Sequence, residues 1–399
     1  MSKSLAHSEG RARPIGLDGV FAAILGNSLE FFDFTVYATF VGAIGATFFP
    51  SASALTSDLA AAATFGVGFV ARPIGGAILG AYADRAGRAP AMNLSIGLMA
   101  IGTAAIAVTP GYEKIGPWAP ILLLIARLLQ GFAVGGEVGP ATVFLIEAAP
   151  VNRRMFYSSW QLASQNLGSL CSGLIGFLLA AALSKSSLAD WGWRLPFALG
   201  ILIAPVGLYM RSRLTDTLDD VARKRKMSAG EAISKVLLRN WRRLLLALAL
   251  ISGGTITQYF LHSLTPYAIR TLRMADSTAM LATVTLGVTG CLGALAGGLL
   301  ADRYDVRVVA TTPRIILTLA LFPLMSVLVA HPSPLALVLT TSLLSAMQGM
   351  SGAVTILLIP PIFPQETRAT SLAISYSLGV AIFGGTATYV VTWLVGVPR

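Results

Sequence analysis

Charged residues are scarce in this chain. Asp, Glu, Lys and Arg make up 12% of the 399 residues, whereas 55% are hydrophobic. A soluble domain carries roughly twice this charged fraction. The two cysteines, Cys171 and Cys291, lie inside apolar segments, which excludes a disulfide framework. Three scattered histidines offer no metal site, and the lack of a GxxxxGK[ST] motif argues against ATP as the energy source.

The hydrophobic residues form long blocks rather than narrow stripes. Eleven blocks are long enough to cross a bilayer as helices, and turn or charge clusters separate them. These predicted spans are residues 17–48, 57–82, 90–110, 118–146, 155–183, 194–211, 242–270, 277–300, 308–330, 334–359 and 368–395. The sequence therefore predicts an all-α, polytopic membrane protein.

Lys and Arg are concentrated in the loops on one side of the predicted spans. That side holds the N-terminus and the basic stretch 211–243, so the positive-inside rule predicts a cytoplasmic N-terminus. The basic stretch is interpreted as a linker on the cytoplasmic leaflet, with binding of a partner or of anionic lipid as the alternative. The predicted parts are a tail (1–16), a six-helix half (17–211), the linker (212–241) and a five-helix half (242–399).

Two loops recur in the second part of the chain. GAYADRAGR at Gly80–Arg88 is matched by GLLADRYDVR at Gly298–Arg307, and EAAPVNR at Glu147–Arg153 is matched by IFPQETR at Ile362–Arg368. Both pairs are separated by nearly the same number of residues. This repeat predicts two homologous halves in parallel orientation, joined by the basic linker.

Four charged side chains are predicted inside the membrane. Glu30 and Asp33 are three residues apart, so a helix places them on one face. A charge near the bilayer centre costs roughly 2.5 to 3.5 kcal/mol, so both acids need partners or a wet cavity. Arg72 and Arg127 lie near mid-membrane depth on the second and fourth spans. An arginine keeps its charge, whereas a carboxylate can be neutralised by a proton.

The Gly80–Arg88 loop, its degenerate copy and the two-half layout resemble the major facilitator superfamily. The segments GNSLEFFD (26–33), GFVARPIGG (68–76) and WGWRLPF (191–197) resemble its metabolite:proton symporter branch. The segments FYSSWQLASQ (156–165) and RNWR (239–242) are most similar to citrate/tricarballylate symporters. The resemblance covers nearly all of the chain and implies two pseudo-symmetric helical halves in a bacterial inner membrane.

The number of spans departs from the family pattern. Family members have twelve spans, whereas this chain ends at Arg399, just after the eleventh. We therefore expect six spans in the first half and five in the second, with the twelfth missing and the C-terminus outside.

Arg127 begins an R-x-x-x-G-x-x-x-G pattern with Gly131 and Gly135. This spacing of glycines lets another helix approach closely. The pattern matches the fourth helix of the family, where the arginine pairs with acids of the first helix. The resemblance therefore implies proton coupling at Asp33, paired with Arg127, and at Glu30 as the second choice. The alternative is a fixed structural salt bridge.

Several other polar side chains are predicted to face the interior. Arg72 suits bidentate capture of a carboxylate, and the alternative is that it holds Glu30 or Glu137. Polar residues of the fifth span share one face, either for substrate or for interhelical hydrogen bonds. His262 could respond to pH, although a lone histidine near an outer helix end is more often merely solvated. The predicted substrate-binding residues are Arg72, Arg127, Asn27, Tyr157, Gln161, Ser164, Gln165, Thr255, Gln258, Tyr259, His262 and Gln348.

The resemblance also implies a gate. In the family, the loop after the second helix latches the cytoplasmic side, which assigns gating to Asp84, Arg85 and Arg88, and to Asp302 and Arg303 in the second copy. Ala89 stands where a further basic residue is usual, and Asp305 stands where glycine is usual. Both departures predict a weaker latch.

The functional prediction is a proton-coupled symporter that imports a small di- or tricarboxylate, such as citrate or tricarballylate, by alternating access. The alternatives are symport of proline or glycine betaine, symport of α-ketoglutarate and, more remotely, a receptor that does not transport. We expect no enzyme activity, no nucleic-acid partner, a monomer in the bilayer, and no cofactor beyond the proton gradient. Coupling to Na⁺ stays open.

Overall fold

The computed structural model describes residues 17–86, 88–135, 145, 149–212, 234, 238–359, 362–363 and 368–396, which are mainly helical and include no strand. Up to residue 212, the elements are α1 (Leu17–Thr39), α2 (Val41–Phe48), α3 (Ala54–Ala86), α4 (Arg88–Val108), α5 (Tyr112–Ile115), α6 (Trp118–Gly135), η1 (Val151–Arg153), α8 (Arg154–Ala182), α9 (Lys185–Asp190), η2 (Gly192–Arg194) and α10 (Leu195–Ser212). After it, they are α13 (Trp241–Arg270), α14 (Asp276–Ala301), α15 (Val306–Ala330), α16 (Pro334–Thr355), η4 (Ile356–Leu358), α17 (Arg368–Gly379), η7 (Val380–Gly384) and α18 (Gly385–Gly396).

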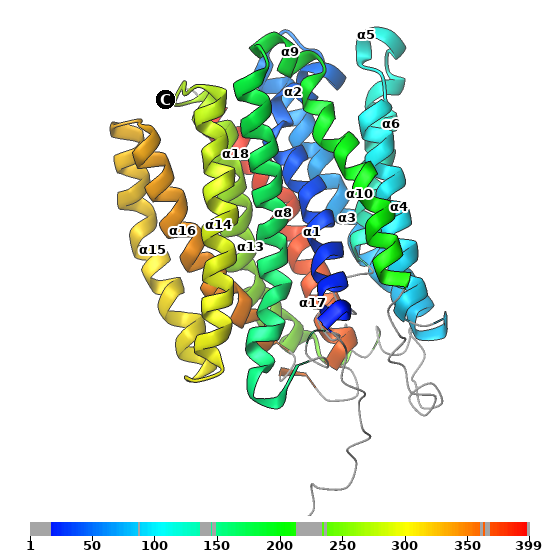
Figure 1. The fold of residues 1–399 in the computed structure, drawn as a ribbon, viewed down its shortest axis with the longest axis vertical. Coiled ribbons are helices and arrows are strands. Elements are labelled where there is room, and N and C mark those ends of the chain that lie inside the picture. The colour runs from blue at the N-terminus through cyan, green and yellow to red at the C-terminus, as the bar shows by residue number, and fades with distance from the viewer. Residues whose placement is uncertain are drawn as a thin grey trace, which may run out of the picture.

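The long helices run up and down between two ends of one bundle (Figure 1). We call the end at Leu17, where α8 and α13 also begin, the lower end. The end at Phe48 and Arg270, where α18 also finishes, is the upper end. Every predicted span overlaps a helix or a helix series of the described residues, although residues 136–144 and 146 of the span 118–146 lie outside them. The all-α prediction is confirmed. Of the predicted parts, the tail 1–16 and most of the linker 212–241 lie outside the described residues.

The long helices have the composition of membrane spans. Among the described residues, 8 helices are long and apolar enough to cross a membrane, or 9 if the bent pair α1 and α2 counts as one span. That pair bends by 67°. The final span contains a π-helical segment, η7, between α17 and α18. Such segments are rare and occur often at functional sites.

Glycine brings α3 and α6 into backbone contact. A Cβ atom at Gly131 would lie 1.7 Å from the carbonyl oxygen of Gly68, and one at Gly135 would lie 2.0 Å from that of Arg72. No other residue fits at such separations, so the close approach predicted for Gly131 and Gly135 is confirmed. One consequence is that Arg72 and Arg127 lie near each other in the interior.

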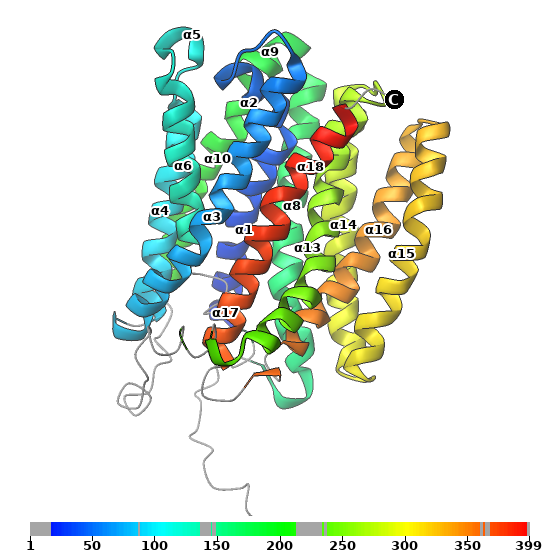
Figure 2. The same cartoon turned by 180° about the vertical axis from the view of Figure 1, so that it is seen from behind.

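The helices up to α10 meet the helices from α13 onward along two main surfaces. Helix α8 packs on α14, and α3 packs on α17 and α18; Figure 2 shows α3 and α18 side by side. Helix α1 also contacts α13. Between these contacts lies the space that holds the candidate site.

Candidate functional site

A central cavity lies between the two groups of helices. Its empty volume is about 750 Å³, including the part open to solvent. The lining comes from α1 and α8 on one side and from α13, α15, α16, η4, α17 and η7 on the other. Because the α8 residues of the lining lie close to the start of that helix, the cavity is nearer the lower end. The polar lining residues are Ser158, Gln161, Gln165, Thr255, Gln258, Tyr259, Arg314, Gln348, Thr355 and Tyr376.

Arg314 is the only charged side chain among the described residues that line this cavity. It lies eight residues into α15, about 12 Å along the helix axis, and is half-buried. Its Nη1 donates a hydrogen bond to Oε1 of Gln348 at 2.7 Å, and Nε2 of Gln348 donates to the carbonyl oxygen of Gly254 at 2.8 Å. Gln348 therefore holds the guanidinium group against α13, at the wall of the cavity.

Sequence reasoning missed Arg314. The signal that could have found it is the one that singled out Arg72 and Arg127, namely a lone arginine inside a long apolar run, here Val306–Ala330. Arg314 follows Pro313 and lies well away from the arginines of the loops, which places it inside the membrane. An ionisable residue there is by default a candidate functional residue.

Half of the predicted substrate-binding residues line the cavity, namely Gln161, Gln165, Thr255, Gln258, Tyr259 and Gln348. Asn27 and Ser164 instead contact each other, because Nδ2 of Asn27 donates to Oγ of Ser164 at 2.7 Å and to the carbonyl oxygen of Gln161 at 2.8 Å. For these two residues the structure favours the alternative of interhelical hydrogen bonding. Tyr157 is half-buried beside Phe156, with the ring centroids 6.1 Å apart.

Arg72 and Arg127 lie in an aromatic cage and are not among the lining residues of the central cavity. The cage is formed by the rings of Phe34, Tyr37, Phe65, Phe69 and Tyr259. The guanidinium carbon of Arg72 is 4.2 Å from the ring centroid of Phe69, and that of Arg127 is 4.4 Å from Tyr37 and 5.0 Å from Phe65. Cation–π contacts of this kind stabilise a desolvated cation. The predicted substrate contacts of both arginines therefore stay predictions, because the described lining of the cavity does not include them.

Tyr259 belongs to both the cage and the central cavity. It lines the cavity, and its ring packs edge-on against Phe34 and Phe69, with centroids 5.5 and 5.3 Å apart. A movement of the cage would therefore reach the cavity wall through this side chain.

Glu30 and Asp33 face a second cavity, inside the first group of helices. It has an empty volume of about 460 Å³ and is lined by α1, α4, α6 and α10. The two cavities have no lining residue in common among the described residues. Phe31, between the two acids on the same helix, lines the central cavity instead.

The expected pairing of Asp33 with Arg127 is indirect. Nη1 of Arg127 donates to Oε1 of Gln130 at 2.8 Å, and Nε2 of Gln130 donates to Oγ1 of Thr103 at 3.0 Å. The Thr103 hydroxyl then donates to Oδ2 of Asp33. This arrangement differs from the predicted direct ion pair, because two uncharged side chains stand between the charges. We call these four residues the relay.

His262 is buried, so the alternative of a merely solvated histidine is wrong. It is not among the described residues that line the central cavity, so its substrate contact stays a prediction. Its Nδ1 lies 2.7 Å from the carbonyl oxygen of Gln258, one turn earlier, where the nitrogen donates the hydrogen bond. Its Nε2 then accepts, 3.2 Å from Oγ of Ser169 and 3.5 Å from Oγ1 of Thr35. The imidazole therefore joins α13 to α1 and α8 above the central cavity.

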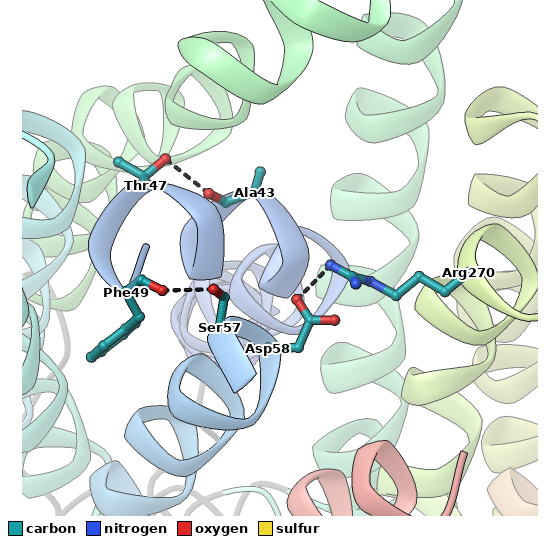
Figure 3. Close-up of polar contacts among 6 residues, drawn as sticks. All are labelled: Ala43, Thr47, Phe49, Ser57, Asp58 and Arg270. Atoms are coloured by element: carbon teal, nitrogen blue, oxygen red, sulfur yellow. Dashed lines mark hydrogen bonds and ion pairs between the residues drawn. The ribbon is translucent and has the colours of Figure 1, made fainter. Parts of the chain in front are cut away.

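An ion pair joins α13 to α3 at the upper end of the bundle. Arg270 at the end of α13 donates to Oδ1 of Asp58 near the start of α3 (Figure 3). The Asp58 side chain is 3% exposed and that of Arg270 is 40% exposed. A Cβ atom at Gly42 would lie 2.7 Å from Nη2 of Arg270, so glycine at this position leaves room for the guanidinium group.

We expect Arg270→Gln to lower the midpoint of thermal unfolding by a few degrees. The substitution leaves the Asp58 carboxylate buried without its cation, which costs on the order of 1 to 3 kcal/mol at a partly exposed pair. Adding Asp58→Asn should recover part of the loss, because the uncompensated charge is then removed. The measurement is thermal unfolding of the purified variants in detergent.

The matched control for this pair is Arg273→Gln, which removes an exposed arginine from the same end of the bundle. A double variant that is less stable than Arg270→Gln alone would show that the pair is not what stabilises this end.

At the lower end, Asp302 links the two groups of helices. Its carboxylate accepts hydrogen bonds from the backbone N–H groups of Met155 at 2.9 Å and Phe156 at 3.2 Å. The carboxylate thereby caps the N-terminus of α8, where the helix dipole favours a negative charge. Arg303 is exposed. The side chains of Asp84, Arg85 and Arg88 lie outside the described residues, so gating there stays a prediction.

Comparisons with known proteins agree with this architecture. The family described as Major Facilitator Superfamily matches residues 23–388. A citrate-proton symporter of Klebsiella pneumoniae is 35% identical over 371 residues, which cover 93% of this chain and 83% of the relative. The alpha-ketoglutarate permease of Escherichia coli is 36% identical over 377 residues, covering 93% and 85%. The proline/betaine transporter of the same species is 30% identical over 390 residues, covering 94% and 77%.

Among solved structures, a crystal structure of a D-xylose-proton symporter superposes with a TM-score of 0.73 at 19% identity, covering 94% of this chain and 88% of the other. At this identity the likeness concerns the fold alone. Together, the helical bundle, its central cavity and the match to nearly the full length show that the chain belongs to the Major Facilitator Superfamily, a family of multi-pass membrane transporters rather than enzymes.

Proposed function

We propose that the protein is a proton-coupled symporter that imports a small di- or tricarboxylate, with citrate or tricarballylate as the first candidates. The observation that carries the proposal is the central cavity, in which Arg314 is the only charged side chain of the described lining. Arginine presents a fork of donors that matches a carboxylate. A cavity whose described lining holds one cation and no Asp or Glu favours anions.

The remaining lining supports a substrate with several oxygen atoms. The amides of Gln161, Gln165 and Gln258 and the hydroxyls of Thr255 and Tyr259 line the same space. Each can donate to a second carboxylate or exchange hydrogen bonds with a substrate hydroxyl. The substrates for which the relatives are named also support this chemistry, since citrate, alpha-ketoglutarate, proline and betaine all carry a carboxylate group.

A zwitterionic osmolyte is the second candidate. Phe31, Tyr259 and Tyr376 line the central cavity, and aromatic faces bind quaternary ammonium groups. Against this candidate, no Asp or Glu is among the described lining residues, so an ammonium group would have ring faces as its partners.

Transport would proceed by alternating access. The lower end is assigned to the cytoplasm of a bacterial inner membrane, because the helices that flank the basic stretch 211–243 end or begin there. The Asp58–Arg270 pair at the upper end and the Asp302 cap at the lower end would then break in alternation, while the helices of each half move together. The driving ion is assigned as a proton, taken up at Asp33, and no organic cofactor is involved.

We expect proteoliposomes with an acidic exterior to accumulate labelled citrate or tricarballylate above its external concentration. A protonophore should abolish this accumulation, since the pH gradient supplies the free energy. Replacing all Na⁺ by choline should leave uptake unchanged if the proton is the coupling ion. Uptake that ignores the pH gradient would overturn the proposed symport, and no uptake of any tested compound would favour a receptor.

The substrate class is tested separately by thermal shift. Purified protein would be heated with citrate, tricarballylate, alpha-ketoglutarate, proline or glycine betaine. A ligand present at 100 times its Kd stabilises the folded state by about 2.7 kcal/mol, which is measurable. Stabilisation by betaine and proline alone would replace the carboxylate assignment with the second candidate.

A further inference from the structure

We propose that Thr103 and Gln130 are positioning residues for the proton site. Through them, Arg127 holds one oxygen atom of Asp33 in place and leaves the other without a hydrogen bond from the relay, beside the cavity lined by α1, α4, α6 and α10. This inference rests on the proposed proton coupling at Asp33, and it adds two uncharged residues on α4 and α6 that carry the coupling.

The hydrogen-bond chemistry of the relay allows a single direction. Arg127 has donors only, so the Gln130 oxygen must accept and the Gln130 amide N–H₂ is left to donate. That amide donates to Oγ1 of Thr103, whose single hydrogen is therefore free to point at Asp33. Every bond thus runs from the cation toward the carboxylate and favours the ionised acid at its far end.

The second carboxylate oxygen of Asp33 is where a proton would add. Oδ1 is buried and has no hydrogen-bond partner among the described residues. A Cβ atom at Gly200 would lie 2.7 Å from Oδ1, so the glycine on α10 leaves space beside this oxygen. A proton from water in the cavity would bond to Oδ1 and convert the carboxylate to a neutral acid, while Oδ2 keeps its bond from Thr103. Release returns the proton to water.

Few charged or titratable groups surround Asp33 in the part of the chain that the structure describes. Glu30 lines the same cavity from the same helix, and Arg127 acts from α6 through the relay. The lining residues that α4 and α10 contribute, including Ser95 and Thr103, are uncharged. Of these charged groups, Arg127 reaches Asp33 through a hydrogen-bonded series, whereas Glu30 shares its cavity.

The relay also connects the proton site to the central cavity. When Asp33 is neutral, it no longer attracts the Arg127 guanidinium group along the relay. Arg127 lies over the rings of Tyr37 and Phe65, and the Phe65 ring lies 6.4 Å from that of Tyr259, which lines the central cavity. The proton and the carboxylate would thus occupy separate cavities and communicate through packed side chains.

The test compares Thr103→Val with Thr103→Ser in proteoliposomes, with citrate as the probe. Valine keeps the shape and removes the hydroxyl, whereas serine keeps the hydroxyl. Loss of a hydrogen bond to a charged group changes an equilibrium constant by a factor of about 10 to 100. We therefore expect Thr103→Val to lower gradient-driven accumulation at least about tenfold while citrate counterflow without a gradient stays near wild type. Thr103→Ser should keep both activities and the wild-type pH profile.

Ser95→Ala is the matched control. Ser95 lines the same cavity from the same helix, but its hydroxyl donates only to the carbonyl oxygen of Ala91 in that helix, so accumulation should be unchanged. Gln130→Leu breaks the link between Arg127 and Thr103 and should reproduce the Thr103→Val result. Thermal unfolding is used to confirm that both variants are folded.

Two results would overturn the relay: Thr103→Val that accumulates citrate like wild type, or Thr103→Ser that is as impaired as Thr103→Val. Failure of the proposed function looks different, because wild-type protein itself would then show no gradient-driven accumulation.

Discussion

Replacing Arg314 by glutamine is expected to weaken citrate binding by one to two orders of magnitude. The guanidinium group is the only cation among the described residues that line the central cavity, and a charge-assisted hydrogen bond contributes roughly 1.5 to 3 kcal/mol. Arg314→Lys should give an intermediate loss, because lysine keeps the charge without the planar fork. The measurement is the Kd for citrate by isothermal titration calorimetry in detergent.

The matched control is Arg307→Gln on the same helix. Arg307 is exposed near the lower end of α15, so its loss removes the same charge without touching the cavity. A citrate Kd for Arg314→Gln that equals the Arg307→Gln value would remove Arg314 from the binding site. A larger loss for Arg72→Ala than for Arg314→Gln would return the substrate contact to the aromatic cage.

Replacing Asp33 by asparagine is expected to abolish accumulation of citrate against its gradient while exchange continues. Asparagine has nearly the shape of the protonated acid and offers an oxygen to Thr103, but it cannot release a proton. Binding and exchange need no net proton movement, whereas uphill uptake does. The measurement is the ratio of internal to external citrate under an imposed pH gradient, compared with counterflow at equal pH.

Glu30→Gln provides the comparison for the proton site, because Glu30 lines the same cavity from the same helix. Uphill uptake that survives in Asp33→Asn but is lost in Glu30→Gln would move the coupling site to Glu30. Loss of exchange as well as accumulation in Asp33→Asn would indicate a structural role for the carboxylate.

Features that lie close together along the chain were predictable. The spans follow from apolar length, because a helix needs about twenty apolar residues to cross the hydrocarbon core. The contact between α3 and α6 follows from Gly131 and Gly135, since their spacing places both on one face of a helix. The family likewise follows from short motifs, such as the loop at Gly80–Arg88, that keep their order and spacing.

Features that depend on how each helix is rotated were not predictable. Arg72 and Arg314 both lie inside apolar runs, yet Arg72 packs against Phe69 while Arg314 lines the central cavity. Periodicity shows which residues share a face, but not which neighbour that face meets. For the same reason the sequence left open whether His262 is solvated, and packing of α13 against α1 and α8 buries it.

Taken by itself, the sequence determined a polytopic helical protein of the Major Facilitator Superfamily with two acids on its first span. The tertiary structure decided what those acids face. Thr103 and Gln130 are far from Asp33 along the chain, and only the packing of α1, α4 and α6 brings them into one hydrogen-bonded series. Such a series has no local signature, because an uncharged threonine or glutamine costs little inside a helix until a neighbour supplies its partner.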